Sequence, residues 1–172
     1  MIGDREIAGR INVLIGPRYG TLLVGGAPEP EYLPSVGRRR AIIRYTRDHA
    51  QSVLHEIAHW CLADPAYRAL PDYGLSYVAP PRSAPEQAAF FAAEERVQAL
   101  ESILALACDL NFHVSADQIG EDVRVFEQKV VKRAAAIRQR GLSGCAREVL
   151  DAVRTPRSRI EVNLRENMSQ VR

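Results

Sequence analysis

The segment that most constrains the fold is a helical pattern over residues 46–63, which is apolar on most of its sides. Thr46 or Asp48 can cap its start. A helix without a broad polar face is stable only when other elements cover it, so we expect a buried central helix. Two histidines, His55 and His59, interrupt this apolar surface.

The two histidines belong to the sequence His-Glu-Ile-Ala-His, which is the H-E-x-x-H motif in the helical context that the motif requires. Four residues make just over one helical turn, so the imidazoles of His55 and His59 project from one face and can hold one divalent cation. Glu56 lies about 100° round the helix, where it can act on a bound water without being a ligand. Two buried imidazoles without a metal are costly in apolar surroundings, which favours the metal over a hydrogen-bonded pair.

A third protein ligand is needed to hold such a metal and to leave positions open for reactants. A capping box at residues 83–86 begins a long helix that reaches about Cys108. With about 100° per residue, Glu94 and Glu101 flank the apolar stripe of this helix, whereas Glu95 points the opposite way, toward solvent. We favour Glu94 because it lies nearer the helix start, but Glu101 stays open, and all three glutamates could be surface charges.

The whole pattern predicts an α+β fold in which a small sheet packs against several helices, with the metal between the two longest helices. The other expected elements are a helix over residues 4–15 that Gly16-Pro17 ends, strands over 21–24, 32–33 and 41–45, and helices over 123–140 and 146–153. Residues 1–153 are expected to form one catalytic domain, and residues 154–172 a polar, loosely ordered tail.

Composition excludes several classes of protein. The chain has 172 residues, 47% hydrophobic and 26% charged, so it can bury a core without a structural metal, and a metal would serve chemistry. A net charge of +2 argues against a large basic face for nucleic acid. No signal peptide or membrane-spanning run is visible, and the three cysteines lack a C-x-x-C spacing. We therefore expect a cytoplasmic protein, with Cys61 packed in the core.

The connection over residues 64–85 holds five prolines and is too long for a simple turn, which indicates a functional loop. Asp72, Tyr73 and Tyr77 in this loop are predicted to line a substrate pocket, although its tyrosines could equally pack as lids. His113 lies in another loop and could approach the metal, but a lone loop histidine is more often structural.

Two histidines and one glutamate suit two chemistries. With Zn(II), Glu56 would act as general base on a bound water, giving a peptidase or another hydrolase. With Fe(II), the same ligands leave open positions for dioxygen, giving an oxygenase. The spacing alone favours zinc, since H-E-x-x-H is best known in metalloproteases. A metal-bound interaction module without turnover is a third class.

Residues 54–61 read Leu-His-Glu-Ile-Ala-His-Trp-Cys, and other short motifs lie on either side of them in the chain. This run resembles the signature of the bacterial elongation factor P hydroxylase family, in which H-E-x-x-H is followed directly by Trp-Cys. The further matches are residues 29–34 with E-P-x-Y-L-P, 72–77 with D-F-G-x-x-Y, 98–100 with Q-A-L and 112–117 with F-N-V-S-x-D. The resemblance covers about residues 28–120.

This resemblance implies a mononuclear metal, with iron expected, and oxygen-dependent hydroxylation of a lysine on elongation factor P. It implies no 2-oxoglutarate, because the family does not belong to the 2-oxoglutarate-dependent jelly rolls. The family's acidic position before Q-A-L falls on Glu94. The chain departs from the family pattern after Tyr77, at Arg96-Val97 and at His113, all outside the metal motif. A zinc hydrolase, or an oxygenase acting on a small amino-acid-like molecule, is therefore the alternative.

Overall fold

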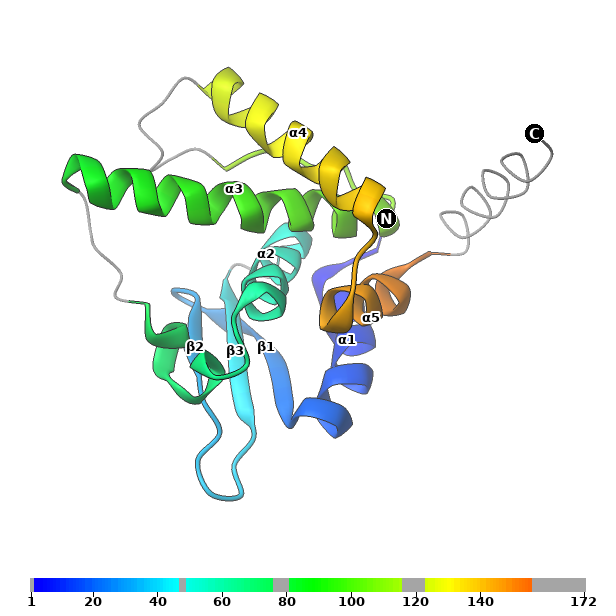
Figure 1. The fold of residues 1–172 in the computed structure, drawn as a ribbon. Helices are drawn as coiled ribbons and strands as arrows, with labels where there is room; N and C mark the ends of the chain where they lie inside the picture. The colour runs from blue at the N-terminus through cyan, green and yellow to red at the C-terminus, as the bar shows by residue number, and fades with distance from the viewer. Residues whose placement is uncertain (1, 47–48, 76–80, 116–122, 156–172) are drawn as a thin grey trace.

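The computed structural model describes residues 2–46, 49–75, 81–115 and 123–155. In these ranges it contains five α-helices and a three-stranded sheet, which confirms the predicted α+β class (Figure 1). The elements are α1 (Asp4–Tyr19), β1 (Thr21–Ala27), β2 (Glu31–Leu33), β3 (Ala41–Thr46), α2 (Ala50–Leu62), the 3-10 helices η1 (Tyr67–Ala69) and η2 (Pro71–Gly74), α3 (Ala84–Ala107), α4 (Val123–Arg140) and α5 (Gly144–Val153). No helix in the described ranges is long and apolar enough to cross a membrane.

The sheet has the strand order β1-β3-β2, with β3 parallel to β1 and antiparallel to β2. Ile43 of the central strand pairs with Leu23 on one side and with Tyr32 on the other, and all three side chains are buried. Their inward faces give the sheet an apolar side on which a helix can pack.

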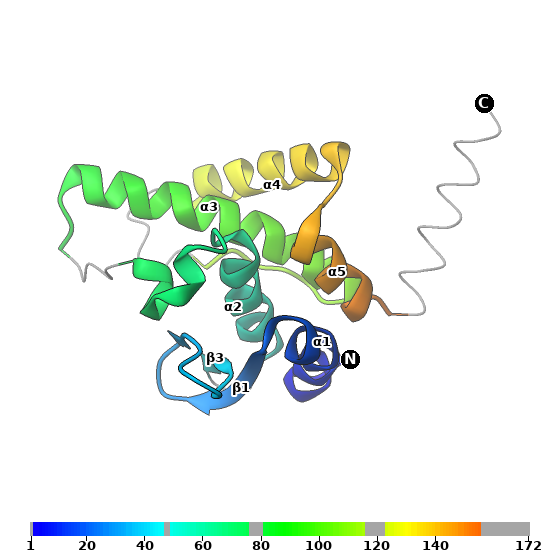
Figure 2. The same cartoon turned by 60° about the horizontal axis from the view of Figure 1, so that its bottom comes forward.

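Helix α2 lies between this sheet and α3, and α4 covers the opposite side of α3 (Figures 1 and 2). Helices α1 and α5 pack against each other and close the remaining side of α2. The apolar residues of α2 are buried, as its sequence pattern predicts; they are Val53, Leu54, Ile57, Ala58 and Trp60. The two histidines of the motif are thus carried by a helix that other elements cover on several sides.

The predicted end of the first helix at Gly16-Pro17 is wrong. Helix α1 continues through Pro17 to Tyr19 and ends at Gly20, which has a left-handed φ of 60° and donates its N–H to the Gly16 carbonyl. Proline keeps a helical φ and removes only one N–H donor, here close to the end of the helix. The extension places the Tyr19 ring edge-on against Trp60, with 5.1 Å between ring centroids, so tertiary packing offsets the lost hydrogen bond.

The predicted start of the central helix is also wrong. Thr46 is the last residue of β3, where it pairs with Ala27, so it cannot cap the helix. Asp48 lies outside the described residues. Helix α2 begins at Ala50 after His49, whose side chain makes no capping hydrogen bond. The strand therefore includes one residue, Thr46, that the helical pattern alone assigned to the helix.

The capping box that begins α3 is confirmed. Ser83 donates its backbone N–H to Glu86 Oε2 at 2.8 Å, and the reciprocal bond to the Ser83 side chain is also present. This start fixes the phase of a helix of 24 residues that carries Glu94, Glu95 and Glu101.

Candidate metal centre

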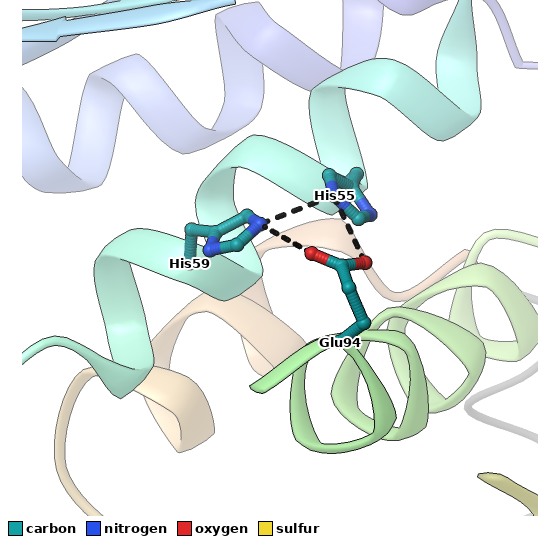
Figure 3. A group of neighbouring side chains, drawn as sticks. All are labelled: His55, His59 and Glu94. Atoms are coloured by element: carbon teal, nitrogen blue, oxygen red, sulfur yellow. Dashed lines mark hydrogen bonds and ion pairs between the residues drawn. The ribbon is translucent and has the colours of Figure 1, made fainter. Parts of the chain in front are cut away.

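Helices α2 and α3 pack together so that three predicted ligands face one point (Figure 3). His55 and His59 come from α2 and Glu94 from α3, and one ligand atom from each lies within 4.8 Å of the other two. The Nε2 atoms of His55 and His59 are 3.1 Å apart. The Glu94 carboxylate oxygens lie 3.5 Å from His59 Nε2 and 3.8 Å from His55 Nε2.

These distances suit a single cation. Two ligand atoms that each lie about 2.1 Å from a metal are about 3.0–3.5 Å apart at tetrahedral or octahedral angles. The donors are two imidazole nitrogens and one carboxylate oxygen, a set that both zinc and iron(II) accept. The residues present therefore fit a mononuclear metal, and small movements of Glu94 would complete its approach.

Glu101, the rival candidate from the same helix, lies behind His55 rather than in this group. Its Oε2 accepts a hydrogen bond from His55 Nδ1 at 2.9 Å, and the residue is only 5% exposed. This bond turns the other ring nitrogen, Nε2, toward His59 and Glu94. Burial alone would lower the pKa of His55, but the Glu101 hydrogen bond and charge outweigh it and raise that pKa to about 9. Glu101 thus orients the ring that Glu94 faces.

Glu94 is ionised although it is buried. Desolvation would raise the pKa of Glu94, but the hydrogen bond to His59 and the charges of both histidines lower it to about 2. A ligating carboxylate must be deprotonated, and this environment keeps it so at neutral pH.

Gln98 holds Glu94 from one helical turn further on. The Gln98 side chain is 1% exposed and donates from Nε2 to Glu94 Oε2 at 3.0 Å and to the Ser115 carbonyl at 2.9 Å. Its Oε1 accepts from the Ser115 N–H at 3.0 Å. Apart from its place in the Q-A-L motif, no local sequence pattern marks Gln98 as a site residue. The Gln98 amide contacts both the candidate ligand Glu94 and the loop residue Ser115, and these contacts form only in the folded structure.

Two other glutamates lie near this region. Glu56 faces the histidines, and burial raises its pKa while the histidine charges oppose that shift. Such a carboxyl can hold a proton at a pH where an exposed glutamate cannot.

Glu95 points away from the group as predicted, but it is not simply solvated, because it is half-buried and pairs with Arg133 of α4. That ion pair joins α3 to α4.

A cavity of about 230 Å³ adjoins the group at His59. Tyr67 and Tyr73, from the connection after α2, form part of its lining. The lining also includes one acidic and one basic side chain, Asp64 and Arg96, among mostly apolar neighbours. The sequence analysis noted Arg96 only as a departure from the family pattern and did not single out Asp64, because their approach depends on how the connection folds back onto α3.

The loop holds Tyr73 in a strained backbone conformation. Asp72 and Tyr73 have left-handed φ values of 46° and 60°, which cost non-glycine residues ~1–3 kcal/mol each. Asp72 Oδ1 accepts the Tyr32 N–H at 2.8 Å, and the Tyr73 ring stacks on Tyr32 with centroids 4.3 Å apart. The Tyr73 hydroxyl is buried and has no hydrogen-bond partner among the described residues. Tyr73 therefore lines the cavity, whereas Asp72 braces β2.

The remaining predicted site residues lie elsewhere. Tyr77 is outside the described residues. His113 is exposed, and its carbonyl accepts a hydrogen bond from Gln51, so its imidazole is not part of the group formed by His55, His59 and Glu94.

Fold and site together define a class, namely α+β proteins in which an H-E-x-x-H helix and a neighbouring glutamate form a candidate mononuclear metal centre. The family model for elongation factor P hydroxylases matches residues 11–166. The elongation factor P lysine hydroxylase of Haemophilus influenzae is 36% identical over 141 residues, which are 80% of this chain and 79% of that protein. The chain belongs to the elongation factor P hydroxylase family, as the resemblance of its motifs predicts.

Proposed function

We propose that this protein is a metal-dependent oxygenase that hydroxylates a lysine of elongation factor P. The observation that carries the proposal is the convergence of His55, His59 and Glu94 beside a cavity, in a chain of this family. The name of the Haemophilus relative supports both the lysine and the factor. Iron(II) is the favoured metal, since two histidines and one carboxylate with open positions suit iron(II) oxygenases. No 2-oxoglutarate is expected, and the cytoplasm is the proposed location.

Each side chain of the centre has a proposed task. His55, His59 and Glu94 would hold iron(II), which when bound supplies the activation of dioxygen that hydroxylation of a C–H bond requires. Glu101 keeps the His55 ring oriented through Nδ1. Glu56, whose pKa burial raises, would hold a proton on its carboxyl beside the reacting atoms and release it when the oxygen is reduced.

The substrate side chain is proposed to enter through the cavity at His59. Lysine has a long apolar stem with a charged end, so apolar walls suit the stem and a carboxylate suits the ammonium group. Asp64 is the acidic residue of the lining, and the unpartnered Tyr73 hydroxyl offers a further hydrogen bond. Tyr77 is proposed as a third contact and Asp72 as the support of Tyr73.

Intact-mass spectrometry of elongation factor P would test this function. The factor is purified from a host strain that lacks this protein, so that any earlier modification is retained but the proposed hydroxylation is absent, and is incubated with iron(II)-loaded protein, a reductant and air. We expect a gain of one oxygen, absent with His59→Ala and retained with His113→Ala. A mass unchanged with fully iron-loaded protein would exclude the factor as substrate.

A zinc hydrolase is the second candidate, and the position of Glu56 beside the two histidines favours it. Metal analysis after anaerobic purification separates the two. Iron supports the oxygenase, whereas zinc together with cleavage of peptide or amide substrates supports the hydrolase. Zinc after aerobic purification decides nothing, because zinc binds such sites more tightly than iron(II).

A further inference from the structure

Cys61 near the end of α2 and Cys145 at the start of α5 lie in contact, although they are 84 residues apart in the chain. The Cys145 thiol donates to the Cys61 carbonyl oxygen, with Sγ 3.5 Å from that oxygen. Both are free cysteines, and both residues are partly exposed. Packing in the core, the role expected for Cys61, does not require a second thiol at this place.

Cys145 also has a positively charged neighbour. Arg68 Nη2 lies 3.5 Å from Cys145 Sγ, and the guanidinium of Arg68 lies 3.9 Å from the centroid of the Trp60 ring. In the part of the chain that the structure describes, Arg68 has no carboxylate partner. Cys145 is also in the first turn of α5, where the helix terminus favours an anion. The Cys61 hydrogen bond and Arg68 lower the pKa of Cys145 to about 6, which makes its sulfur the nucleophile of the pair.

We propose that Cys61 and Cys145 form a redox-active dithiol that closes to a disulfide by exchange with a small disulfide of the glutathione type. The Cys145 thiolate attacks one sulfur of oxidised glutathione, whose S–S bond breaks as a mixed disulfide forms and one glutathione thiolate leaves. Cys61 loses its proton and attacks the Cys145 sulfur, which releases the second glutathione. Two protein thiols are oxidised, one glutathione disulfide is reduced to two thiols, and the two protons end on the glutathione sulfurs.

The disulfide would join the last turn of α2 to the first turn of α5. Because α2 also carries His55 and His59, the redox state of the pair acts on the helix of the metal centre. A covalent link between residues 84 positions apart restricts the unfolded chain strongly, so the oxidised protein is expected to melt several degrees above the reduced one.

The test uses the full chain, freed of metal and reduced, in a series of glutathione redox buffers. The reaction is quenched by alkylation and read by intact mass and peptide mapping. We expect two thiols to disappear together as a Cys61–Cys145 disulfide, while Cys108, which is 1% exposed, reacts only after unfolding. Cys108→Ser should behave as the wild type. Cys61→Ser should stop at a glutathione adduct on Cys145, and Cys145→Ser should form neither product.

Two results would overturn the proposal. The first is a disulfide that involves Cys108 as often as Cys61. The second is the absence of closure at every glutathione ratio in protein whose circular dichroism is that of the folded chain. Arg68→Gln should slow formation of the mixed disulfide several-fold, whereas Arg133→Gln, which breaks the ion pair between α3 and α4, should not. Neither iron nor elongation factor P enters the assay, so its outcome is separate from that of the proposed hydroxylation.

Discussion

The helix pair α2–α3 and the loop after α2 treat their polar groups in opposite ways. On the helices, the candidate ligands His55 and Glu94 each have a supporting partner: Glu101 lies behind His55, and Gln98 holds Glu94. On the loop, Tyr73 sits in a strained conformation with a buried hydroxyl that has no partner among the described residues. A metal binds more tightly to ligands that are already held in position. The lining of a substrate pocket, by contrast, needs polar groups that are free to bind the substrate. The difference supports a division of roles in which the helix pair α2–α3 would hold the proposed metal and the loop would contact the proposed substrate.

Removal of a candidate ligand from the helix pair α2–α3 should have the largest effect. His59→Ala is expected to lower metal content to background, because the two residues left cannot hold a mononuclear cation tightly. Metal analysis of the purified variant, with circular dichroism to verify the fold, checks this. His113→Ala is the matched control and should keep full occupancy, since His113 is exposed and outside the group. Full occupancy in His59→Ala would show that the centre lies elsewhere.

Glu101→Gln should have the next largest effect. The amide can still meet His55 Nδ1 but carries no charge, so metal affinity is expected to fall by about 10–100-fold without loss of the site. A competition titration with a chelator measures this change. Glu95→Gln removes a carboxylate from the same helix, on the side paired with Arg133, and should leave the affinity unaltered. An equal loss in both variants would point to damage of α3 rather than of the ring orientation.

The pH dependence of the melting temperature of the metal-free protein should depend on the contact between His55 and Glu101. The folded-state pKa of His55 is raised to about 9 from 6.5, so its protonated form stabilises the fold fully below pH 6.5. That stabilisation is lost as the pH rises from 6.5 through 9. The melting temperature of chelated protein is therefore expected to fall across this window, and to fall less in Glu101→Gln. A flat profile in the wild type would contradict the strength of the His55–Glu101 contact.

At acid pH the opposite dependence is expected, because stability falls as the pH is lowered. The pKa of Glu94 is lowered to about 2 from 4.5, so its ionised form stabilises the fold above pH 4.5 and this contribution is lost as the pH falls toward 2. Glu94→Gln in chelated protein should flatten this acid limb, as thermal melts at fixed ionic strength would show.

Tyr73→Phe should have the smallest effect and tests the loop. The variant removes only an unpartnered hydroxyl, so stability should stay the same or rise by up to about 1 kcal/mol. The KM for the substrate is expected to rise several-fold with kcat nearly unchanged, because the hydroxyl is proposed to bind rather than react. Tyr67→Phe is the control from the same cavity, with an exposed side chain. A large loss of kcat would instead place Tyr73 in the chemistry.

Elements whose signals lie in neighbouring residues could be predicted from the amino-acid sequence. The apolar pattern over residues 46–63 predicted the central helix, although that helix begins only at Ala50. The spacing of His55 and His59 predicted their common face, and the capping box at Ser83 predicted the start of α3. Helical steps along α3 separated Glu95 from the other two glutamates. In each case the deciding residues lie within a few turns of one another, so backbone geometry relates them directly.

Which of these groups come into contact follows from the packing of the elements. It placed Glu94 in front of His55 and Glu101 behind it, carried α1 past Pro17, and brought Cys145 to Cys61. These distances depend on how side chains that are far apart in the sequence pack together between the elements. A local sequence pattern does not contain that information. Candidate residues of the site can therefore be predicted from the sequence. Which of them face the proposed metal and which hold a ligand in place follows from packing.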